Sequence, residues 1–381
     1  IPNDPIFQLN FPQRGMLTDD EYDRMRVAMS TGDRKTIRAA VRDASNEIRE
    51  GLNPHPAGQR ELNVPKTEGE AIPGIQHKYV ETCLLFPSES QYCHAYCTYC
   101  FRWAQFVGNE GLQFASNDAE TLSNYVASKP GLTDILFTGG DPMVMNSAQF
   151  SRYLDYVLQL DHISTIRIGT KSLAYWPYKY VTDEDADGML RQFERIIAAG
   201  KSCSIMAHFS HPTELQTPVV REAIRRIRNT GAVIRCQAPL MRYINDSAHV
   251  WETMWKEQVK LGMVPYYMFM ARDTGPRAYF EVPLVKAYHI FSDAIARVPG
   301  VARTVRGPSM SATPGKVSVV GLPTINGERV MALKFLQGRN PEWCKELFFA
   351  KYDDTAVWVE GHKSMVPAFG EDRFFFEEPS Q

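Results

Sequence analysis

The stretch Cys93–Arg102, with the sequence CHAYCTYCFR, sets three cysteines at C-x3-C-x2-C spacing. One short loop of this kind can wrap a compact metal centre. Three thiolates can hold three irons of a [4Fe–4S] cube and leave the fourth iron open for a substrate or cofactor. A closed zinc site would need a fourth ligand, and the nearby candidate, His94, lies inside the loop between two of the cysteines. The alternatives are a zinc knuckle or three unrelated core thiols, and features further along the chain favour the cluster.

The composition is that of a globular protein. The chain has 381 residues, enough for one large domain with an appendage or for two domains. Its 44% hydrophobic and 23% charged content predicts an ordinary core. The net charge of −2 gives no reason to expect nucleic-acid binding, and no apolar run is long enough to predict a membrane span. Residue 1 is Ile, so we expect the natural start to lie upstream, and a targeting peptide there stays open.

Cysteine usage indicates the compartment. The chain has seven cysteines, an odd number, and three of them are clustered. Such a thiol-rich pattern is typical of a reduced intracellular protein and not of a disulfide scaffold. We therefore expect a cytoplasmic location.

Residues 1–73 are predicted to form an N-terminal arm and a helical region. Residues 1–17 have the composition of an extended arm. Thr18 and Glu21 then fit a capping box at the start of a helix. Helical patterning continues to Ile48, and residues 55–73 are rich in Pro, Gly and charge, as in a linker. We interpret this region as structural rather than catalytic.

Residues 74–324 alternate between strand and helix patterns. Such βα units predict parallel strands joined by crossover helices. Six units are too few for an eight-fold barrel, so the fold class is α/β with a partial (βα)6 barrel, whose chemistry lies at the C-terminal ends of the strands. The cysteine loop follows the first strand. The expected strands are 82–86, 134–138, 165–170, 202–209, 233–240 and 264–271, and the expected helices lie near 117–129, 147–160, 183–199, 215–230, 249–261 and 284–297.

Polar or glycine-rich groups follow several of these strands. Gly139 and Gly140 in the turn Phe137–Pro142 would let the backbone approach a ligand closely, although alone this is just a turn. At the next strand ends lie His208 and His211, and Gln237, which we expect to be supporting groups of the same site.

A lysine marks a further candidate site. Lys316 follows Pro-Gly and precedes a β-branched strand. It is either an ordinary surface residue or a Schiff-base lysine for pyridoxal 5′-phosphate (PLP). The second role needs a desolvated amine with a lowered pKa on a rigid turn.

Together these residues resemble the lysine 2,3-aminomutase family of PLP-dependent radical S-adenosylmethionine (SAM) enzymes. The resemblance runs from about Pro73 to Lys316. It implies a partial barrel with an N-terminal helical region, a homo-oligomer, a small amino-acid substrate and an external one-electron reductant. The matching stretches are Pro73–Tyr79, the cysteine loop, Phe137–Pro142, Ile166–Gly169, His208–Pro212, Ile244–Asp246 and Pro265–Tyr267.

The resemblance also implies roles for individual residues. Lys78 and Tyr79 fall where the family has an Arg-Tyr pair at the PLP phosphate, and Lys316 matches the Schiff-base lysine. A second phosphate arginine of the family is missing near Thr82. Arg102 matches the arginine that holds the substrate carboxylate, for which a guanidinium fork is well shaped. The cluster ligands would be Cys93, Cys97 and Cys100, and the SAM site would be lined by Tyr99, Gly139, Gly140, Asp141 and Gln237.

Departures from the family bear on the substrate. The lysine enzymes bind the distal ammonium with two aspartates, where this chain has Arg272 and, from the count back from Lys316, Ser309. Such a pocket disfavours a cation, so we predict an amino acid with an acidic or neutral side chain. A one-residue slip would restore a carboxylate, Asp273. The family's C-terminal zinc cysteines are also absent, with Cys344 alone after Lys316, so we expect no structural zinc.

Residues 325–381 are rich in aromatic side chains and are expected to form an oligomerisation or lid segment.

The favoured function is an isomerase that moves the amino group from C2 to C3. Two alternatives stay open. One is a radical SAM and PLP enzyme whose reaction ends in elimination or fragmentation, and the other is a PLP-free enzyme that modifies a lysine of a peptide or protein. The least favoured alternative is a protein that binds a cluster but is not an enzyme.

Overall fold

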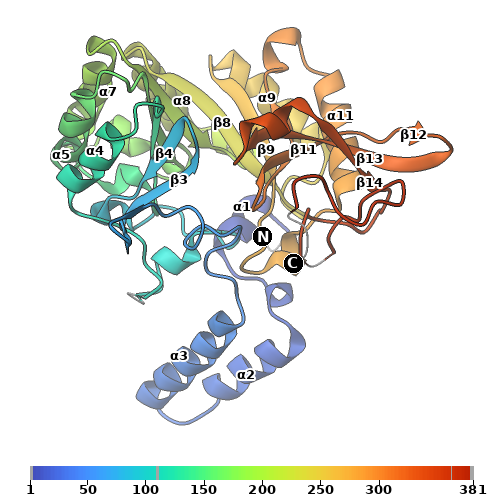
Figure 1. Ribbon diagram of the computed structural model, residues 1–381. Helices are drawn as coiled ribbons and strands as arrows, with labels where there is room; N and C mark the ends of the chain where they lie inside the picture. Colours follow the sequence, from blue (N-terminus) through green and yellow to red (C-terminus); the bar gives the residue numbers. More distant parts are fainter. Residues whose placement is uncertain (1–2, 109–110, 362, 378–381) are drawn as a thin grey trace.

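A sheet of parallel strands in chain order forms the centre of the molecule (Figure 1). The computed structural model describes residues 3–108, 111–361 and 363–377, and these contain one sheet of twelve strands. The parallel part confirms the α/β class, and each of its strands ends within one residue of the predicted bound. The six predicted strands are β4 (Thr82–Leu85), β5 (Asp134–Phe137), β6 (Thr165–Thr170), β7 (Ser202–His208), β8 (Val233–Leu240) and β9 (Val264–Met270).

The strand register aligns buried side chains across the sheet. Cys83 pairs with Ile135, Ile135 with Ile166, and Ile166 with Cys203. All four side chains are at most 1% exposed. Because side chains alternate between the two faces of a strand, this row belongs to one face of the sheet.

Crossover helices join the parallel strands as predicted. Helix α8 (Pro218–Asn229) illustrates why these segments are helical. Thr217 caps its first turn, Pro218 occupies the first helical position, and its buried residues recur at helical spacing (Val220, Ala223, Ile224 and Ile227). The other crossover helices are α4 (Ala119–Ala127), α5 (Ser147–Leu158), α7 (Ala186–Ala198), α9 (Ala248–Lys260) and α11 (Leu284–Ala296).

The sheet continues beyond the six predicted strands on both sides. β3 (Ile75–Tyr79) runs antiparallel to β4. At the other side β10 (Arg306–Ser311) is parallel to β9, and β11 (Gly315–Gly321) is antiparallel to β10. β11 therefore has a hydrogen-bonded neighbour on each side, which fixes the backbone of Lys316. The remaining strands are β12 (Thr324–Ile325), β13 (Glu328–Gly338), which pairs with β11, and β14 (Leu347–Lys351).

The N-terminal arm is not extended, which corrects the sequence-based expectation. Pro5–Asn10 forms helix α1, with the Asp4 carboxylate accepting a hydrogen bond from the Phe7 N–H at 2.9 Å. Pro at the first helical position is already shaped for the helix. Leu9 is fully buried against Met241 and Phe280, so this helix is anchored in a small apolar cluster.

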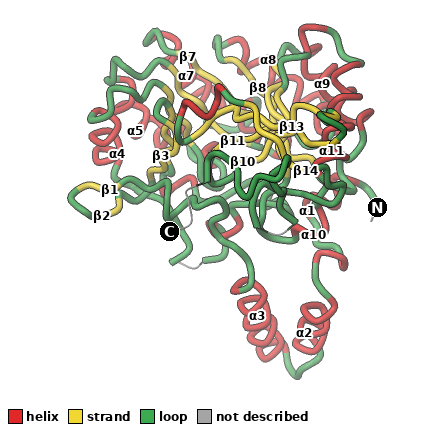
Figure 2. Tube along the Cα trace, turned by 45° about the vertical axis from the view of Figure 1, so that its right-hand side comes forward, coloured by secondary structure: helices red, strands yellow, loops and turns green. Residues whose placement is uncertain are grey.

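The predicted helical region is a hairpin of two helices. The capping box of Thr18 and Glu21 is confirmed at the start of α2 (Asp19–Met29). The chain turns at Gly32, and α3 (Arg34–Glu50) packs back against α2. Figures 1 and 2 show that this hairpin extends away from the sheet. The linker that follows carries a short pairing of β1 (Lys66–Thr67) with β2 (Glu70–Ala71).

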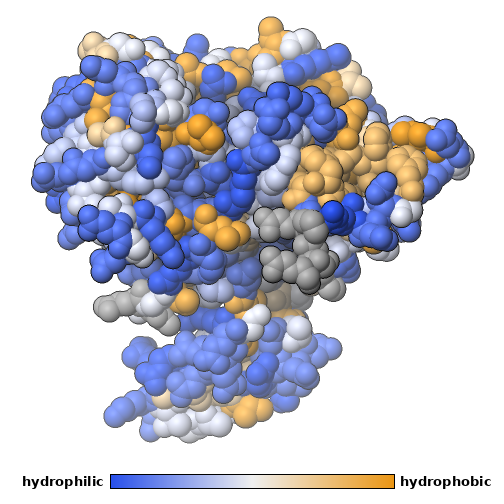
Figure 3. All heavy atoms as spheres, in the orientation of Figure 1, coloured by the Kyte–Doolittle hydropathy of each residue, from blue (hydrophilic) through white to orange (hydrophobic). Residues whose placement is uncertain are grey.

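The C-terminal segment packs aromatic rings on β13 and β14. The ring of Phe335 lies 5.5 Å from Trp343 and 5.4 Å from Phe348, between centroids. The same cluster takes in Phe374 and Phe376. Apolar side chains gather on this side of the surface (Figure 3). In the described parts of the chain, no helix is long and apolar enough to cross a membrane.

Candidate active site

The cysteine loop follows β4, at the C-terminal edge of the parallel strands. All seven cysteines of the chain are free thiols, and Cys93, Cys97 and Cys100 are partly exposed. Tyr96 turns the loop with a left-handed φ of 45°. Burial raises the pKa of Cys93 to about 12, and burial and then the Cys97 sulfur raise the pKa of Cys100 further. These thiols hold their protons unless a metal displaces them.

The donor set of the loop suits an iron–sulfur cube. No three His, Cys, Asp or Glu side chains within residues 3–108, 111–361 and 363–377 are arranged around one metal ion. A [4Fe–4S] cluster takes one cysteine on each of three irons, so its thiolates need not meet at a single point. The competing ligand of a zinc site, His94, instead stacks on Trp176, with ring centroids 6.4 Å apart. The chemistry of the loop therefore favours a cluster.

Gly139 and Gly140, which follow β5, lie in close contact with residues 90–92, just before the cysteine loop. A Cβ at Gly140 would lie 2.2 Å from the Tyr92 carbonyl oxygen, and one at Gly139 would lie 2.3 Å from the Ser90 Oγ. Gly139 also has a φ of 144°. The N–H groups of Gly140 and Asp141 donate to the Ser90 carbonyl at 2.8 and 3.1 Å. Close backbone approach, for which only glycine has room, fixes the start of the loop.

The buried side chain of Asp141 connects the segment after β5 to the end of β6 through hydrogen bonds. Its carboxylate accepts hydrogen bonds from the Thr170 hydroxyl at 2.6 Å and the Lys171 N–H at 2.8 Å. Burial raises the pKa of this carboxyl. The side chain is occupied within the protein, so contacts of this turn with a ligand would come from its backbone. The SAM-binding role of Gly139, Gly140 and Asp141 stays a prediction.

Tyr99 joins the cysteine loop to the end of β7. Its hydroxyl lies 3.2 Å from His208 Nε2 and 3.0 Å from Ser210 Oγ. Gln237 pairs with His208 in the register of β7 and β8, so these three predicted residues come together. His211 does not join them, because its Nδ1 pairs with Thr213 at the start of a short 3-10 helix, Pro212–Leu215.

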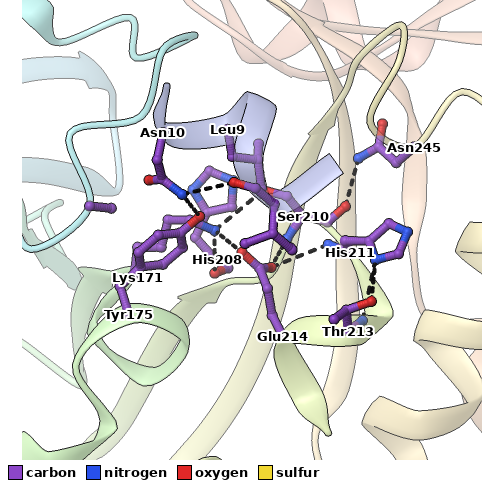
Figure 4. A network of polar contacts seen from close by, with 12 residues as sticks. Leu9, Asn10, Lys171, Tyr175, His208, Ser210, His211, Thr213, Glu214 and Asn245 are labelled. Atoms are coloured by element: carbon purple, nitrogen blue, oxygen red, sulfur yellow. Dashed lines mark hydrogen bonds and ion pairs between the residues drawn. The ribbon is translucent and has the colours of Figure 1, made fainter. Parts of the chain in front are cut away.

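A buried ion pair lies behind this group, and the sequence-based prediction missed it (Figure 4). Lys171 Nζ lies 2.8 Å from Glu214 Oε1, and the two side chains are 5% and 3% exposed. The pair joins the end of β6 to the segment after β7. In the sequence these residues are separated by 42 others, and neither stands in a recognisable motif, so only the fold brings them together.

Lys316 faces aromatic rings and other cations. Its Nζ lies 4.6 Å from the centre of the Tyr267 ring, 5.7 Å from that of Tyr79 and 6.0 Å from that of Phe269. Burial, followed by the charges of Arg167 and Arg306, lowers the pKa of this amine to about 7. A lysine that is neutral near pH 7 can act as a nucleophile toward a carbonyl group.

Lys78 and Tyr79 lie beside Lys316, as predicted. The Lys78 amine donates to the Ala312 carbonyl, four residues before Lys316. Burial, with smaller contributions from Arg272, Arg339 and Lys316, lowers the pKa of Lys78 to about 6. The site gathers basic side chains, and an anion such as a phosphate would favour their protonated forms.

Arg102 and Arg272 meet at the ring of Phe101. Their guanidinium carbons lie 4.9 and 4.5 Å from its centre. Burial and then the neighbouring Arg272 lower the pKa of Arg102 to about 9. Within the described part of the chain, neither guanidinium group has a carboxylate partner. Asp273 does not fill this role, because it pairs with Arg277.

Ser309 lies on β10, on the same face of the sheet as Lys316. The register sets Ser311 opposite Lys316 and Ser309 opposite Ser318, and alternate residues share a face. Ser309 is fully buried, and its hydroxyl has no hydrogen-bond partner among the described residues. A buried hydroxyl without a partner is uncommon and is consistent with a place for a ligand group.

Comparisons with known proteins identify relatives of the chain. Residues 81–181 match a family model described as a 4Fe-4S single cluster domain. A protein of Aquifex aeolicus, provisionally named L-lysine 2,3-aminomutase, is 28% identical over 78% of this chain and 76% of its own length. The L-lysine 2,3-aminomutases of Fusobacterium nucleatum and Bacillus subtilis are 26% and 24% identical, over 62% and 79% of this chain. The match spans only 52% and 65% of those two relatives.

Among solved structures, SuiB of Streptococcus suis bound to its precursor peptide SuiA has a TM-score of 0.40 at 11% identity. It covers 73% of this chain and 58% of that one. A TM-score this low bears on neither the fold nor the function.

The cysteine loop, the parallel sheet and the cluster domain define the class of protein: a radical SAM enzyme with a 4Fe–4S cluster. Within that class the chain is similar to the L-lysine 2,3-aminomutases, as a divergent relative at 24–28% identity.

Proposed function

We propose that the chain is a PLP-dependent amino-acid 2,3-aminomutase whose substrate has an acidic or neutral side chain. The observation that carries this proposal is the setting of Lys316. Its amine faces three aromatic rings, next to the basic side chains of Lys78 and Arg272. Arg272 in turn meets Arg102, two residues beyond the last cysteine of the loop.

The cysteine loop would hold the cluster through Cys93, Cys97 and Cys100. The SAM site would be lined by Tyr99, the turn Gly139–Asp141 and Gln237, at the C-terminal ends of what we take to be a partial (βα)6 barrel. When bound, the cluster and SAM together supply a 5′-deoxyadenosyl radical after uptake of one electron from an external reductant. The protein fixes the loop that holds them, through the close approach of Gly139 and Gly140 to residues 90–92.

PLP would be held by Lys78, Tyr79 and Lys316. When bound, it supplies a conjugated system that lets an amino group migrate between neighbouring carbons. Arg339, whose charge acts on Lys78, would take the place of the arginine that is missing near Thr82. The phosphate would neutralise part of this cation cluster, and the rings of Tyr79 and Tyr267 would keep water from the amine of Lys316.

Arg102 and Arg272 would select the substrate. Arg102 would bind the carboxylate that every α-amino acid carries. Arg272, where the lysine enzymes have an aspartate, would receive the side chain. Because like charges repel strongly in a desolvated site, a lysine side chain would be rejected there, and a carboxylate would be accepted most readily.

The remaining assignments are proposals of the same kind. Seven free thiols support a reducing, cytoplasmic setting. The exposed apolar side chains of the C-terminal segment, Leu347, Phe369 and Phe375, support assembly into a homo-oligomer.

The test is anaerobic turnover by protein with reconstituted cluster, PLP, SAM and a one-electron reductant. Mass spectrometry would follow 5′-deoxyadenosine and isomerised products across the proteinogenic amino acids. We expect an acidic or neutral amino acid to yield its β-isomer, and Lys316→Ala to abolish the product. Lys334→Ala is the matched control, because Lys334 is an exposed lysine on β13, the strand next to β11. This variant should keep full activity.

The other outcomes identify the competing reactions. Turnover of lysine alone would refute the pocket assignment. An amino-acid product that is cleaved or dehydrated would favour elimination or fragmentation. SAM cleavage with no amino-acid product, in protein that binds no PLP, would favour a modifier of a peptide or protein lysine.

A further inference from the structure

Thr274 connects the two segments that carry Arg102 and Arg272. Its hydroxyl accepts a hydrogen bond from Trp103 Nε1 at 2.8 Å and donates one to the Asn53 carbonyl at 2.6 Å. Thr274 is 8% exposed, so these bonds are shielded from water. The hydroxyl thus joins three parts of the chain: the linker after α3, the segment after the cysteine loop and the segment after β9.

The connection to the two arginines is short on both sides. Trp103 directly follows Arg102, at the start of a 3-10 helix, Trp103–Gln105. Thr274 is two residues after Arg272, and its N–H donates to the Arg272 carbonyl at 2.9 Å, which closes a tight turn. One side-chain hydrogen bond therefore joins the backbone beside one arginine to the backbone beside the other.

Arg272 depends on this connection more than Arg102 does. The Arg102 guanidinium carbon contacts two rings, 4.7 Å from the centre of Phe86 and 4.9 Å from that of Phe101. Arg272 lies in an irregular segment between the end of β9 and helix α10 (Arg277–Phe280). Two like charges at one ring repel each other, and a loop yields to such a force more easily than a strand does.

We propose that Thr274 is a positioning residue that fixes the separation of Arg102 and Arg272, and that this separation selects acidic amino acids by their length. The inference rests on the proposed function, in which Arg102 binds the α-carboxylate and Arg272 receives the side chain. Two fixed guanidinium groups suit a substrate with a carboxylate at each end, and they suit one chain length better than the next. Aspartate and glutamate differ by one methylene, so such a site would distinguish them.

The first test needs no cofactor and no substrate. Hydrogen–deuterium exchange with mass spectrometry would follow residues 271–276 in the wild type, Thr274→Val and Trp103→Phe. Thr274→Val removes the hydroxyl and Trp103→Phe removes the donor, so exchange should become about tenfold faster in both, as expected for the loss of one buried hydrogen bond. Thr274→Ser, which keeps the hydroxyl, should restore slow exchange. Unchanged exchange in both variants would overturn the inference and leave the proposed function standing.

The second test is calorimetric binding of aspartate and of glutamate to protein loaded with PLP, without SAM or reductant. We expect the wild type to prefer one of the two by about tenfold. Thr274→Val should remove most of this preference, and Thr274→Ser should keep it. Equal affinities in the wild type, or the same preference in Thr274→Val, would overturn the inference. A wild type that binds neither amino acid would instead refute the substrate assignment of the proposed function, and the length selection with it.

Thr230→Val is the matched control. Thr230 is also 8% exposed, and its hydroxyl likewise accepts one hydrogen bond, from the Ala232 N–H at 3.3 Å, and donates one, to the Ile227 carbonyl at 2.6 Å. It precedes β8, so it lies at the opposite edge of the sheet from the segment that follows the parallel strand β9. Thr230→Val should lower stability but change neither the exchange of residues 271–276 nor the ratio of the two affinities.

Two outcomes separate positioning from general loosening. If Thr230→Val changes the exchange and the affinity ratio as much as Thr274→Val does, the effect is one of stability and the positioning role is wrong. If Thr274→Val does not fold, Trp103→Phe decides, because it removes the same hydrogen bond and leaves the bond from Thr274 to Asn53 in place.

Discussion

The amine of Lys316 lies 4.6 Å from the centre of the Tyr267 ring, on a strand that is hydrogen-bonded on both sides. Burial and nearby arginines lower its pKa to about 7. We therefore expect the rate of PLP uptake by the apoprotein to rise with pH up to about 7 and then level off, because the neutral amine is the reactive form. Stopped-flow absorbance across pH 5–9 would measure this.

The same lysine contributes to pH-dependent stability. Its pKa is lower in the folded chain than its ordinary value of 10.5. Between these two values the unfolded chain binds more protons at this position, so the free energy of unfolding should rise with pH there. Lys316→Met should flatten this part of the apoprotein stability curve. A rate of PLP uptake that keeps rising to pH 9 in the stopped-flow experiment would contradict the lowered pKa.

Replacing Arg272 by Asp should change the substrate preference. The variant loses the cation beside Phe101 and gains a carboxylate, so kcat/KM for an acidic amino acid should fall about 10- to 100-fold, as expected for a charged hydrogen bond. An amino acid with a cationic side chain should become a better substrate. Competition assays with paired substrates would measure the switch.

Asp273→Asn is the control for that prediction. Asp273 pairs with Arg277 instead of facing Phe101, so its loss should leave the substrate preference unchanged. A loss of activity confined to Asp273→Asn, with Arg272→Asp active on the original substrate, would mean that the carboxylate and not the guanidinium anchors the side chain.

Gly140→Ala should disrupt the cysteine loop. Its Cβ would lie 2.2 Å from the Tyr92 carbonyl oxygen, and backbone must move to relieve this contact. We expect a cost of about 1–3 kcal/mol and a clear fall in iron content after reconstitution. Gly131→Ala adds the same methyl group in ordinary contact with Val80, at 3.6 Å. Normal iron content in both variants would show that this turn does not fix the loop.

Leu9→Ala should loosen the N-terminal helix. Leu9 is fully buried in a small cluster with Met241, Ile244 and Phe280, and its truncation should cost about 2–3 kcal/mol. The Thr98 N–H, which bonds to the Leu9 carbonyl at 2.8 Å, should then exchange with deuterium faster. Leu62→Ala, at a side chain that is 55% exposed, should change neither quantity.

The sequence predicted the parallel sheet well because its signals are local. Strand β6 was expected at 165–170, as found, and α8 within three residues of its first position. Helix α1 was missed although Asp4 and Pro5 carry a typical start signal, because the segment is short and its burial depends on distant residues. Lys171 and Glu214 could not be paired from sequence, since their contact depends on how β6 and β7 lie side by side.

Some of the site residues could likewise be predicted from the sequence, and others could not. The resemblance to a known family covers several strands at once. For this reason it could predict that four residues lie close together: Lys78, Tyr79, Lys316 and Arg272. Which of Arg272 and Asp273 meets Phe101 depended on one residue of a loop, and only the structure separates them. His211 was grouped with His208 through its spacing, but the chain turns between them.

Lys316 is held inside a sheet, whereas Arg102 and Arg272 stand on loops after β4 and β9. The parts assigned to shared chemistry are thus built into the most constrained backbone, and the parts assigned to substrate choice lie on loops. A scaffold divided in this way can acquire new substrates during evolution through single changes at its loops, while its radical chemistry is inherited intact.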